Sequence, residues 1–468
     1  MRLYCIFCSK YFDIDSNLIR CDSCNQPLIF RYDDVNSENL VIDSSVKSIW
    51  RYGYIPRFNI PPVTMYEGYT SIYLASRLSD YYGFDTNIYL KDESRNPTGS
   101  FVDRGVSVAV TYAKYRGYRR IVSASPGNLG VSISAYAAKA GIDSEILVPK
   151  NVERGKLYQI LMYGGDVGIY ESFGYAVSEI YRSFKEGSDF YPVMSDNPLY
   201  VEGVKTISLE VYEDLHGALP EYVIVPVGNG ALIYSIFKGF EELRDMGLID
   251  YVPRLVAVQF KGASRIIDAL YGSDGYVFKM YAPEITVDEP LNLEHALYAI
   301  RESDGMGLAV DFEDVVESLK LLSTCEGLIV ELAAASTITA LKYVVEKESP
   351  GSVLCILTGH GLKDPATFRE LTRSARRRLG VEAGHRSAVG RTKLEIIRAI
   401  DEGFQYGYSI MKYLRSKGIA VTLPTIYQHL NELEEMGLIR LSKSTGLGRK
   451  KSIYVLTEKG RMLLRAVG

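Results

Sequence analysis

The sequence predicts an α/β protein whose central parallel-sheet core has a small cysteine-rich unit before it and a basic unit after it. Two Cys-x2-Cys pairs lie within the first 24 residues, and short apolar segments alternate with helix-length amphipathic segments between about residues 64 and 371. From Arg373 onward, 19 Lys and Arg outnumber 8 Asp and Glu. A chain of 468 residues, 47% of them hydrophobic, is long enough for two to four domains.

The N-terminal cysteines have the spacing of a metal site. Cys5 and Cys8 form one pair, and Cys21 and Cys24 form a second pair. Four thiolates in two such pairs match the tetrahedral coordination of structural zinc. Because about 30 residues cannot bury enough surface to fold alone, the metal would supply the free energy of folding. We therefore predict a zinc ribbon over residues 1–33.

Five short apolar segments predict strands in the core domain, which we place at residues 34–372. Their alternation with amphipathic segments indicates parallel sheets covered by helices on both faces. In such sheets, functional residues collect at the carboxyl ends of the strands. The predicted strands are residues 121–123, 145–148, 222–225, 255–258 and 353–357.

A glycine-rich segment follows the third of these strands. Residues 226–232 read Pro-Val-Gly-Asn-Gly-Ala-Leu and open a predicted helix. Glycines let the backbone approach an anion closely, and the first N–H groups of a helix are free to bind it. The segment is therefore a candidate phosphate cradle, although taken alone it is also typical of a structural strand-to-helix turn.

The segment that bears most directly on catalysis is residues 91–105, Lys-Asp-Glu-Ser-Arg-Asn-Pro-Thr-Gly-Ser-Phe-Val-Asp-Arg-Gly. It resembles the cofactor-attachment segment of the threonine synthase family, a group of fold-type II pyridoxal-phosphate enzymes. The resemblance implies a tryptophan synthase β-like core of two α/β subdomains, and a lysine after Phe101 that forms a Schiff base with the cofactor. Val102 stands at that position and has no amine, so no Schiff base can form there. Rescue by Lys91 is an alternative, although the family already has a lysine at that place.

Three further motifs resemble the same family in the same order. Residues 123–130 resemble its Ser-Gly-Asn loop, residues 202–206 its Glu-Gly-x-Lys-Thr helix start, and residues 358–365 its closing Thr-Gly-His-Gly loop. The resemblance implies that the asparagine faces the 3'-hydroxyl of pyridoxal phosphate and that the threonine bonds to the pyridine nitrogen. The implied cofactor-binding residues are Asn128, Gly228, Asn229, Gly230 and Thr358.

Other departures from the family pattern lie near the implied cofactor. Pro126 stands where the family usually has Ser or Thr, Ala231 replaces a glycine, and Leu332 replaces a proline. A side chain at position 231 crowds the approach to a phosphate, and a proline at 126 removes both an N–H and a hydroxyl. This clustering favours a site that has lost catalysis while the fold and a pocket remain.

The basic C-terminal part divides into a linker and a folded unit. Residues 373–391 are rich in Arg, Gly and Ser and have no apolar period, which predicts a linker. Residues 392–468 predict three helices, of which the third is capped by Thr422 and begins at Pro424. A hairpin with strands at 438–441 and 452–456 and a last short helix follow. Three helices and a hairpin with a basic tip form the pattern of a winged helix.

Within this unit, residues 407–410, 425–434, 437–439 and 456–460 resemble PadR-type transcription regulators. The resemblance implies that the third helix enters the major groove of DNA and that the hairpin tip contacts phosphates. The local excess of positive charge favours DNA binding, although a winged helix used for protein contact or dimerisation has the same pattern. The implied DNA-binding residues are Thr425, Tyr427, Gln428 and His429 on the helix, and Arg449, Lys450 and Lys451 on the hairpin.

The sequence thus predicts a DNA-binding transcriptional regulator whose threonine-synthase-like domain binds an amino acid, a phosphorylated amino acid or pyridoxal phosphate without a covalent link. The alternative is an active threonine synthase or related lyase acting on O-phosphohomoserine, with an accessory winged helix. A third hypothesis is a regulatory partner of a lysine-bearing paralogue. Both families lead us to expect a homodimer. The sequence has no apolar run of about 20 residues and no signal-peptide core, which predicts no membrane association and a cytoplasmic location.

Overall fold

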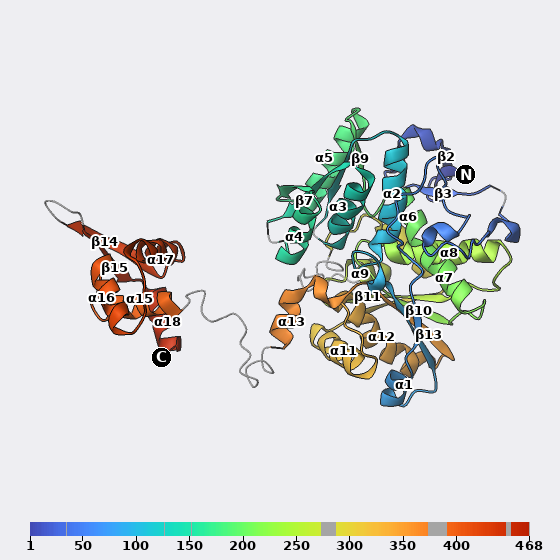
Figure 1. The fold of residues 1–468 in the computed structure, drawn as a ribbon. Coiled ribbons are helices and arrows are strands. Elements are labelled where there is room, and N and C mark those ends of the chain that lie inside the picture. Colours follow the sequence, from blue (N-terminus) through green and yellow to red (C-terminus); the bar gives the residue numbers. More distant parts are fainter. Residues whose placement is uncertain are drawn as a thin grey trace. The chain divides into compact units, whose positions relative to one another are not determined.

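The computed structural model describes residues 1–33, 35–125, 127–150, 152–272, 287–372, 391–445 and 451–467. The chain divides into two compact units, Met1–Phe368 and Arg369–Gly468 (Figure 1). The predicted linker, residues 373–391, lies outside the described residues except for Arg391, which begins a helix.

The N-terminal residues form a small antiparallel sheet in the order β2-β1-β3. Its strands are β1 (Arg2–Cys5), β2 (Lys10–Phe12) and β3 (Ile29–Arg31). The side chains of Leu3, Leu28 and Phe30 are buried in the same apolar cluster as the helices of the core. The ribbon is therefore packed onto the core domain and shares its hydrophobic interior.

The first half of the core is built on a four-stranded sheet in the order β8-β7-β6-β9, in which every pair of neighbours is parallel. The strands are β6 (Arg120–Ala124), β7 (Asp143–Pro149), β8 (Asp166–Tyr170) and β9 (Phe190–Pro192), and the helices are α2 (Val102–Tyr115), α3 (Asn128–Ala140), α4 (Arg154–Met162), α5 (Phe173–Lys185) and α6 (Pro198–Val204). Sequence signals set several element ends: α3, for example, is ended by Gly141, whose φ of 71° suits glycine.

The second half is built on a six-stranded sheet in the order β12-β11-β10-β13-β5-β4. Neighbours are parallel except at the edge, where β4 runs antiparallel to β5. The strands are β4 (Ile72–Leu74), β5 (Asn87–Asp92), β10 (Tyr222–Pro226), β11 (Arg254–Phe260), β12 (Met306–Val310) and β13 (Ser352–Leu357). The helices are α1 (Ser76–Tyr82), α7 (Thr206–Asp214), α8 (Ala231–Asp245), α9 (Arg265–Tyr271), α10 (Leu293–Glu302), α11 (Phe312–Cys325), α12 (Leu332–Glu348) and α13 (Pro365–Leu371).

The five strands predicted from the sequence correspond to β6, β7, β10, β11 and β13, and they divide between the two sheets. This arrangement confirms the predicted α/β core with two subdomains. In Figure 1 the first sheet lies in the upper part of the core and the second in the lower part. The edge strand β4 has only three residues, too few for a periodic pattern to reveal.

A buried ion network holds α2 against β5 and α7. Arg104 on α2 is fully buried and makes contacts of 2.7 Å with Glu93 and of 2.6 Å with Glu210. Lys91 on β5 pairs with the same Glu210 at 2.8 Å and donates to the carbonyl oxygen of Thr70 at 2.8 Å. Because these cations lie next to its carboxylate, the pKa of Glu210 is well below its ordinary value in spite of burial.

A second buried ion cluster joins the ribbon to α6 and α8. The Tyr32 hydroxyl, just after β3, donates to Glu202, which pairs with Lys205 at 2.5 Å and with Lys238 at 2.9 Å. Glu242 on α8 pairs with both lysines. The Glu-Gly-x-Lys-Thr motif therefore contributes two members of a structural contact between the ribbon and α8.

The described part of the C-terminal unit contains three helices, a hairpin and a last helix, as predicted for a winged helix. Thr422 caps α17 by accepting from the N–H of Thr425, and the inward side chains Ile426, Leu430 and Leu433 are buried. The elements are α15 (Arg391–Asp401), α16 (Gly407–Ser416), α17 (Leu423–Glu435), β14 (Ile439–Thr445), β15 (Lys451–Leu456) and α18 (Glu458–Val467).

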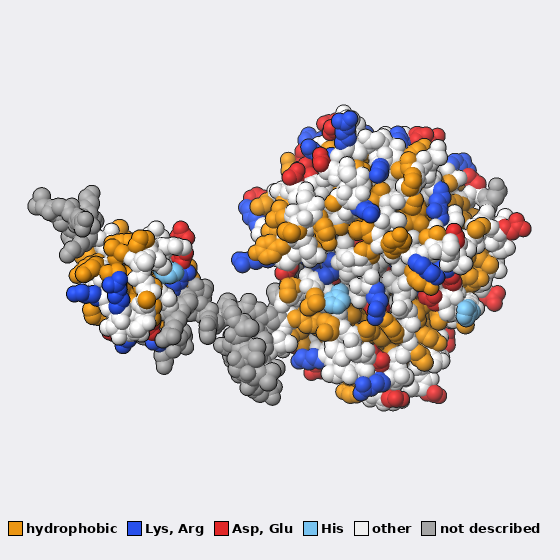
Figure 2. All heavy atoms as spheres, in the orientation of Figure 1, with side chains coloured by type: hydrophobic (Ala, Val, Ile, Leu, Met, Phe, Trp, Pro, Cys, Tyr) orange, Lys and Arg blue, Asp and Glu red, His pale blue; other side chains and the backbone are white. Residues whose placement is uncertain are grey.

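The surface of the core domain mixes charges of both signs. On the face that Figure 2 shows, basic and acidic side chains are interspersed with apolar ones. Among the described residues, no helix combines the length and the apolar character that a transmembrane segment needs.

Candidate ligand-binding site

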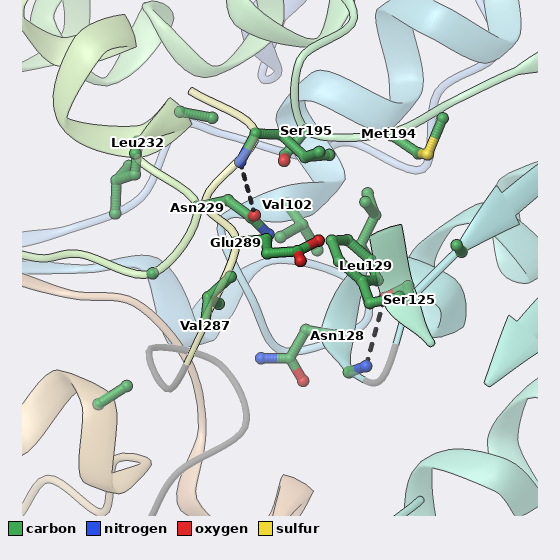
Figure 3. A pocket seen from close by; sticks show the side chains of 18 of the residues that line it. Val102, Ser125, Asn128, Leu129, Met194, Ser195, Asn229, Leu232, Val287 and Glu289 are labelled. Carbon is green, nitrogen blue, oxygen red and sulfur yellow. Dashed lines mark hydrogen bonds between the residues drawn. The ribbon is translucent and has the colours of Figure 1, made fainter. Parts of the chain in front are cut away.

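A cavity of about 520 Å³ lies where the strand ends of the two sheets meet (Figure 3). It is lined by the loop after β6, the loop after β10, the end of β13 and the start of α2. The predicted site residues that line it are Val102, Asn128, Gly228, Asn229, Gly230 and Thr358. These residues span more than half of the chain, so their meeting at one cavity depends on the tertiary fold.

Val102 is the first residue of α2 and is 5% exposed, and its side chain lies at the cavity wall. Its neighbours fix the backbone here. Phe101 donates its N–H to the carbonyl oxygen of Thr358 at 3.0 Å, and Asp103 accepts from the N–H and the hydroxyl of Thr98 at 2.7 and 2.6 Å. Burial raises the pKa of Asp103 to about 6. The position of the side chain at residue 102 is therefore set by hydrogen bonds of its neighbours and does not depend on which side chain stands there.

The lining contains no lysine among the described residues. Lys91, the alternative amine considered from the sequence, is engaged in the ion network with Glu210 and does not line the cavity. Lys363 is buried as well, which lowers its pKa to about 8, but its amine donates to the carbonyl oxygen of Thr98 at 2.5 Å. No amine of the described lining is thus placed to take over from position 102.

Glu331 connects two of the predicted residues at the cavity floor. Its carboxylate accepts from the side-chain N–H of Asn128 at 2.9 Å and from the hydroxyl of Thr358 at 2.8 Å. Glu331 is buried, and an added Cβ on Gly359 would lie 2.8 Å from its carboxyl carbon, so a larger residue at 359 would displace this carboxylate. In the sequence, Leu332 stood out for the lost proline, and no pattern pointed to the neighbouring carboxylate of Glu331.

The glycine-rich segment forms a tight turn into α8. Gly230 has a φ of 88°, and an added Cβ would lie 2.6 Å from the carbonyl oxygen of Asn292. Asn229 accepts from the backbone N–H groups of Leu291 and Asn292 at 3.2 and 2.9 Å. Figure 3 shows Asn229 held in this way beside Glu289. The Asn229 side-chain oxygen therefore positions the segment that closes one side of the cavity.

The residues present fit part of a pyridoxal-phosphate site. Helix α8 begins without a side-chain cap, so its first N–H groups and Gly228 offer a place for an anion. Thr358 and Asn128 stand together at the floor. Covalent attachment does not fit, because the described lining offers no amine. Ala231 and Leu232 also line the cavity, whereas Pro126 lies outside the described residues.

Comparison with known proteins agrees with this geometry. The family model "Pyridoxal-phosphate dependent enzyme" matches residues 63–359. The chain belongs to this family. The threonine synthase of Methanocaldococcus jannaschii is 37% identical over 377 residues, which cover 77% of this chain and 92% of the relative. That of Methanosarcina acetivorans is 34% identical and covers 78% and 93%.

Solved structures show the same fold for this pyridoxal-phosphate-dependent enzyme domain. A pyridoxal 5'-phosphate-dependent aspartate racemase aligns with a TM-score of 0.54 at 19% identity, covering 65% of this chain and 97% of that structure. An O-ureido-L-serine synthase variant aligns with a TM-score of 0.55 at 20% identity, covering 71% and 97%. The model "Transcriptional regulator PadR-like family" matches residues 396–466, so the chain combines this enzyme family's fold with a PadR-like domain.

The four N-terminal cysteines of this family member form a cluster that fits zinc. The sulfur atoms of Cys5, Cys8, Cys21 and Cys24 all lie within 4.8 Å of one another, and Cys5 and Cys24 approach to 3.5 Å. Sulfurs around a tetrahedral zinc with bonds of about 2.3 Å are about 3.8 Å apart. The cluster therefore has the dimensions that the predicted site requires.

We expect one zinc ion per chain, and we expect Cys21→Ser to lose it. Because the metal would supply the folding energy of the ribbon, its loss should expose residues 1–33 to limited proteolysis while the core fragment persists. Metal content by mass spectrometry and the cleavage pattern test this. Cys325→Ser, outside the cluster, is the control. Full zinc retention in Cys21→Ser would contradict the assignment of this ligand.

The PadR-like domain places four predicted DNA-binding residues on α17. Tyr427 is 40% exposed and packs against Gly407, where an added Cβ would lie 2.8 Å from its ring. Gln428 and His429 both bond to Glu432, at 3.1 and 3.3 Å. These two side chains must leave Glu432 to contact a base. Thr425 shares a hydrogen bond with the Thr422 hydroxyl at 2.8 Å.

The hairpin residues are only partly described. Arg449 and Lys450 lie outside the described residues, and for Lys451 only the backbone, at the start of β15, is described. Their role in DNA binding stays a prediction from the sequence.

Proposed function

We propose that this chain is a DNA-binding transcriptional regulator whose pyridoxal-phosphate-dependent enzyme domain senses a small ligand and does not catalyse. The observation that carries the proposal is the valine at position 102, together with a described cavity lining that offers no amine in its place. In this family the cofactor acts as an electron sink for substrate carbanions once a protein lysine has attached it. Without that lysine, the chain would lack both the covalent anchor and a general base.

The proposed ligand is an amino acid or a phosphorylated amino acid. Pyridoxal phosphate, where it binds, would be held without a covalent bond by the start of α8 and by Thr358. The cysteine cluster would hold zinc in a structural role. The protein would act in the cytoplasm as a homodimer, since paired winged helices match the symmetry of paired half-sites in DNA.

The second candidate function is an active threonine synthase or related lyase acting on O-phosphohomoserine, with the PadR-like domain as an accessory. Its support is the pair of relatives named threonine synthase, of which the chain covers 92% and 93%. The retained Asn128, Thr358 and glycine-rich turn are also consistent with it. It requires an amine from outside the described lining.

The two functions predict different covalent chemistry. We expect that the unaltered chain, incubated with pyridoxal phosphate and then borohydride, gains no fixed cofactor at a cavity residue in peptide mass spectrometry. Val102→Lys should gain one adduct per chain at position 102, because the surrounding backbone contacts hold that position at the cavity wall.

Val102→Met is the matched control, since it adds length without an amine. Borohydride-fixed cofactor at a cavity residue of the unaltered chain, with threonine formed from O-phosphohomoserine, would establish the enzyme and end the sensor proposal.

A further inference from the structure

The cavity lining is acidic. Among its described residues, five are Asp or Glu and none is Lys, Arg or His. The Glu331 carboxylate accepts hydrogen bonds from Asn128 and Thr358, and Glu171 pairs with Lys150 at 2.8 Å on the surface. Lys363 and Lys156 are buried nearby but do not line the cavity. A phosphorylated ligand would bring a double negative charge into this lining without meeting a basic side chain.

The polar atoms left unpaired in the lining include hydrogen-bond acceptors. Because the carboxylate of Glu331 can only accept, it fixes the N–H group of the Asn128 amide and turns the amide oxygen away. That buried oxygen has no partner among the described residues, and neither has the buried hydroxyl of Ser195. Both side chains are more than nine-tenths buried and line the cavity. A ligand with N–H donors would satisfy them.

A single anionic group also has a place in the cavity. The helices α3 and α8 both begin in its lining. In the first turn of α3 the N–H of Gly130 donates to the Ser125 hydroxyl, and α8 begins without a side-chain cap, so other N–H groups of the two first turns are available. Backbone N–H groups at a helix start can hold a carboxylate, the charge of which a neighbouring ammonium can balance.

The rest of the wall is largely apolar. At position 102 and in the turn into α8, valine and leucine side chains face the space, and Figure 3 shows Val102, Leu129, Met194 and Leu232 around it. Burying an aliphatic or aromatic side chain against such a wall contributes about 1.5–3 kcal/mol of binding free energy before other costs.

We propose that this cavity binds an unphosphorylated α-amino acid with an apolar side chain. Its ammonium group would donate to the Asn128 oxygen, its carboxylate would meet free N–H groups at a helix start, and its side chain would pack on Val102 and Leu232. The Ser195 hydroxyl, on the other side of the cavity in Figure 3, would bond to a different part of the ligand or to water. This inference rests on the proposed sensor function and narrows the ligand class to which the sensor responds.

Binding of candidate ligands to the full-length chain tests the inference directly. The probes for calorimetry are L-isoleucine, L-leucine, L-phenylalanine, O-phosphohomoserine, pyridoxal phosphate and inorganic phosphate. We expect at least one apolar amino acid to bind at least tenfold more tightly than each phosphorylated probe. Tighter binding of a phosphorylated probe, or no binding of the three amino acids, would overturn the inference.

Charge reversal at the cavity rim provides a second test. Glu289 is exposed and lines the rim, so Glu289→Lys should fold normally and shift the preference toward O-phosphohomoserine by roughly tenfold. Glu179→Lys, on α5 outside the lining, is the control and should leave the preference unchanged. An unchanged preference in Glu289→Lys would contradict the role assigned to charge.

Gel-shift titrations with promoter DNA separate this inference from the proposed function. An apolar amino acid that binds without altering DNA affinity would end the sensor function and leave the ligand assignment standing. A phosphorylated ligand that binds and alters DNA affinity would end the ligand assignment and leave the sensor function standing.

Discussion

Replacing Arg104 with alanine should lower the free energy of unfolding of the core by about 3–5 kcal/mol, the usual cost of removing one partner from a buried ion pair. Arg104 is fully buried and contacts both Glu93 and Glu210. Without it, Glu93 would remain buried without its cation, and Glu210 would keep only Lys91. Urea unfolding followed by tryptophan fluorescence measures the change, since the single tryptophan, Trp50, lies buried in the core.

The same substitution should change how stability depends on pH. The folded-state pKa of Glu210 is below its ordinary value, so its ionised form contributes stability that is present above the unfolded-state pKa and is lost as pH falls. Arg104→Ala removes its largest stabilising neighbour. We therefore expect the loss of stability to be largest at neutral pH and to shrink in acid.

Arg182→Ala is the matched control. Arg182 pairs with Glu179 on the same helix, and its side chain is 63% exposed. Pairs of this kind contribute at most about 1 kcal/mol. If both variants lost the same small amount, the network around Arg104 would not be a principal support of the fold.

The second large effect is expected at the hairpin of the PadR-like domain. Changing Arg449, Lys450 and Lys451 together to alanine should weaken DNA binding by at least tenfold at low salt. Each phosphate contact contributes about 0.9 to the slope of log affinity against log salt, so losing all three should reduce the slope by about 2.7. Fluorescence anisotropy with a labelled promoter fragment, measured at several salt concentrations, gives both quantities.

A control for charge alone is Lys342→Ala with Lys347→Ala, on the exposed surface of α12 in the enzyme-fold domain. This variant should bind DNA as the unaltered chain does. If the hairpin variant kept both its affinity and its salt slope, these three residues would not contact DNA. The winged helix would then bind DNA through other residues, or would serve in protein contact or dimerisation.

Much of the site followed from the sequence because its motifs lie at strand ends. In a parallel sheet these ends share one edge, so Gly228 and Thr358, after β10 and β13 of one sheet, had to come close once the strands were placed. Asn128 follows β6 of the other sheet and reaches them only because the two sheets meet at the cavity. The Thr422 cap likewise fixed the start of α17, because a threonine before a leucine and a proline is a strong local signal.

The contacts that escaped prediction join residues far apart in the sequence. Asn128 and Glu331 are 203 positions apart, and no local pattern links them. The place of Lys91 was also beyond the sequence, since its pairing with Glu210 depends on how β5 packs on α7. The contacts of Glu432 with Gln428 and His429 are different: their spacings of four and three are visible on a helix and could have been predicted.

The cluster around Tyr32 connects the ribbon to the helix that borders the cavity. Tyr32 bonds to Glu202, which holds Lys238 on α8, and the first turn of α8 forms the glycine-rich edge of the cavity. The ribbon and the edge of the cavity thus belong to one continuous packed unit. If metal in the ribbon favours the arrangement of α8 that binds ligand, linkage requires that ligand in the cavity also raise the affinity for metal. Ligand affinities measured on metal-depleted protein would then be lower than those of the metal-bound protein.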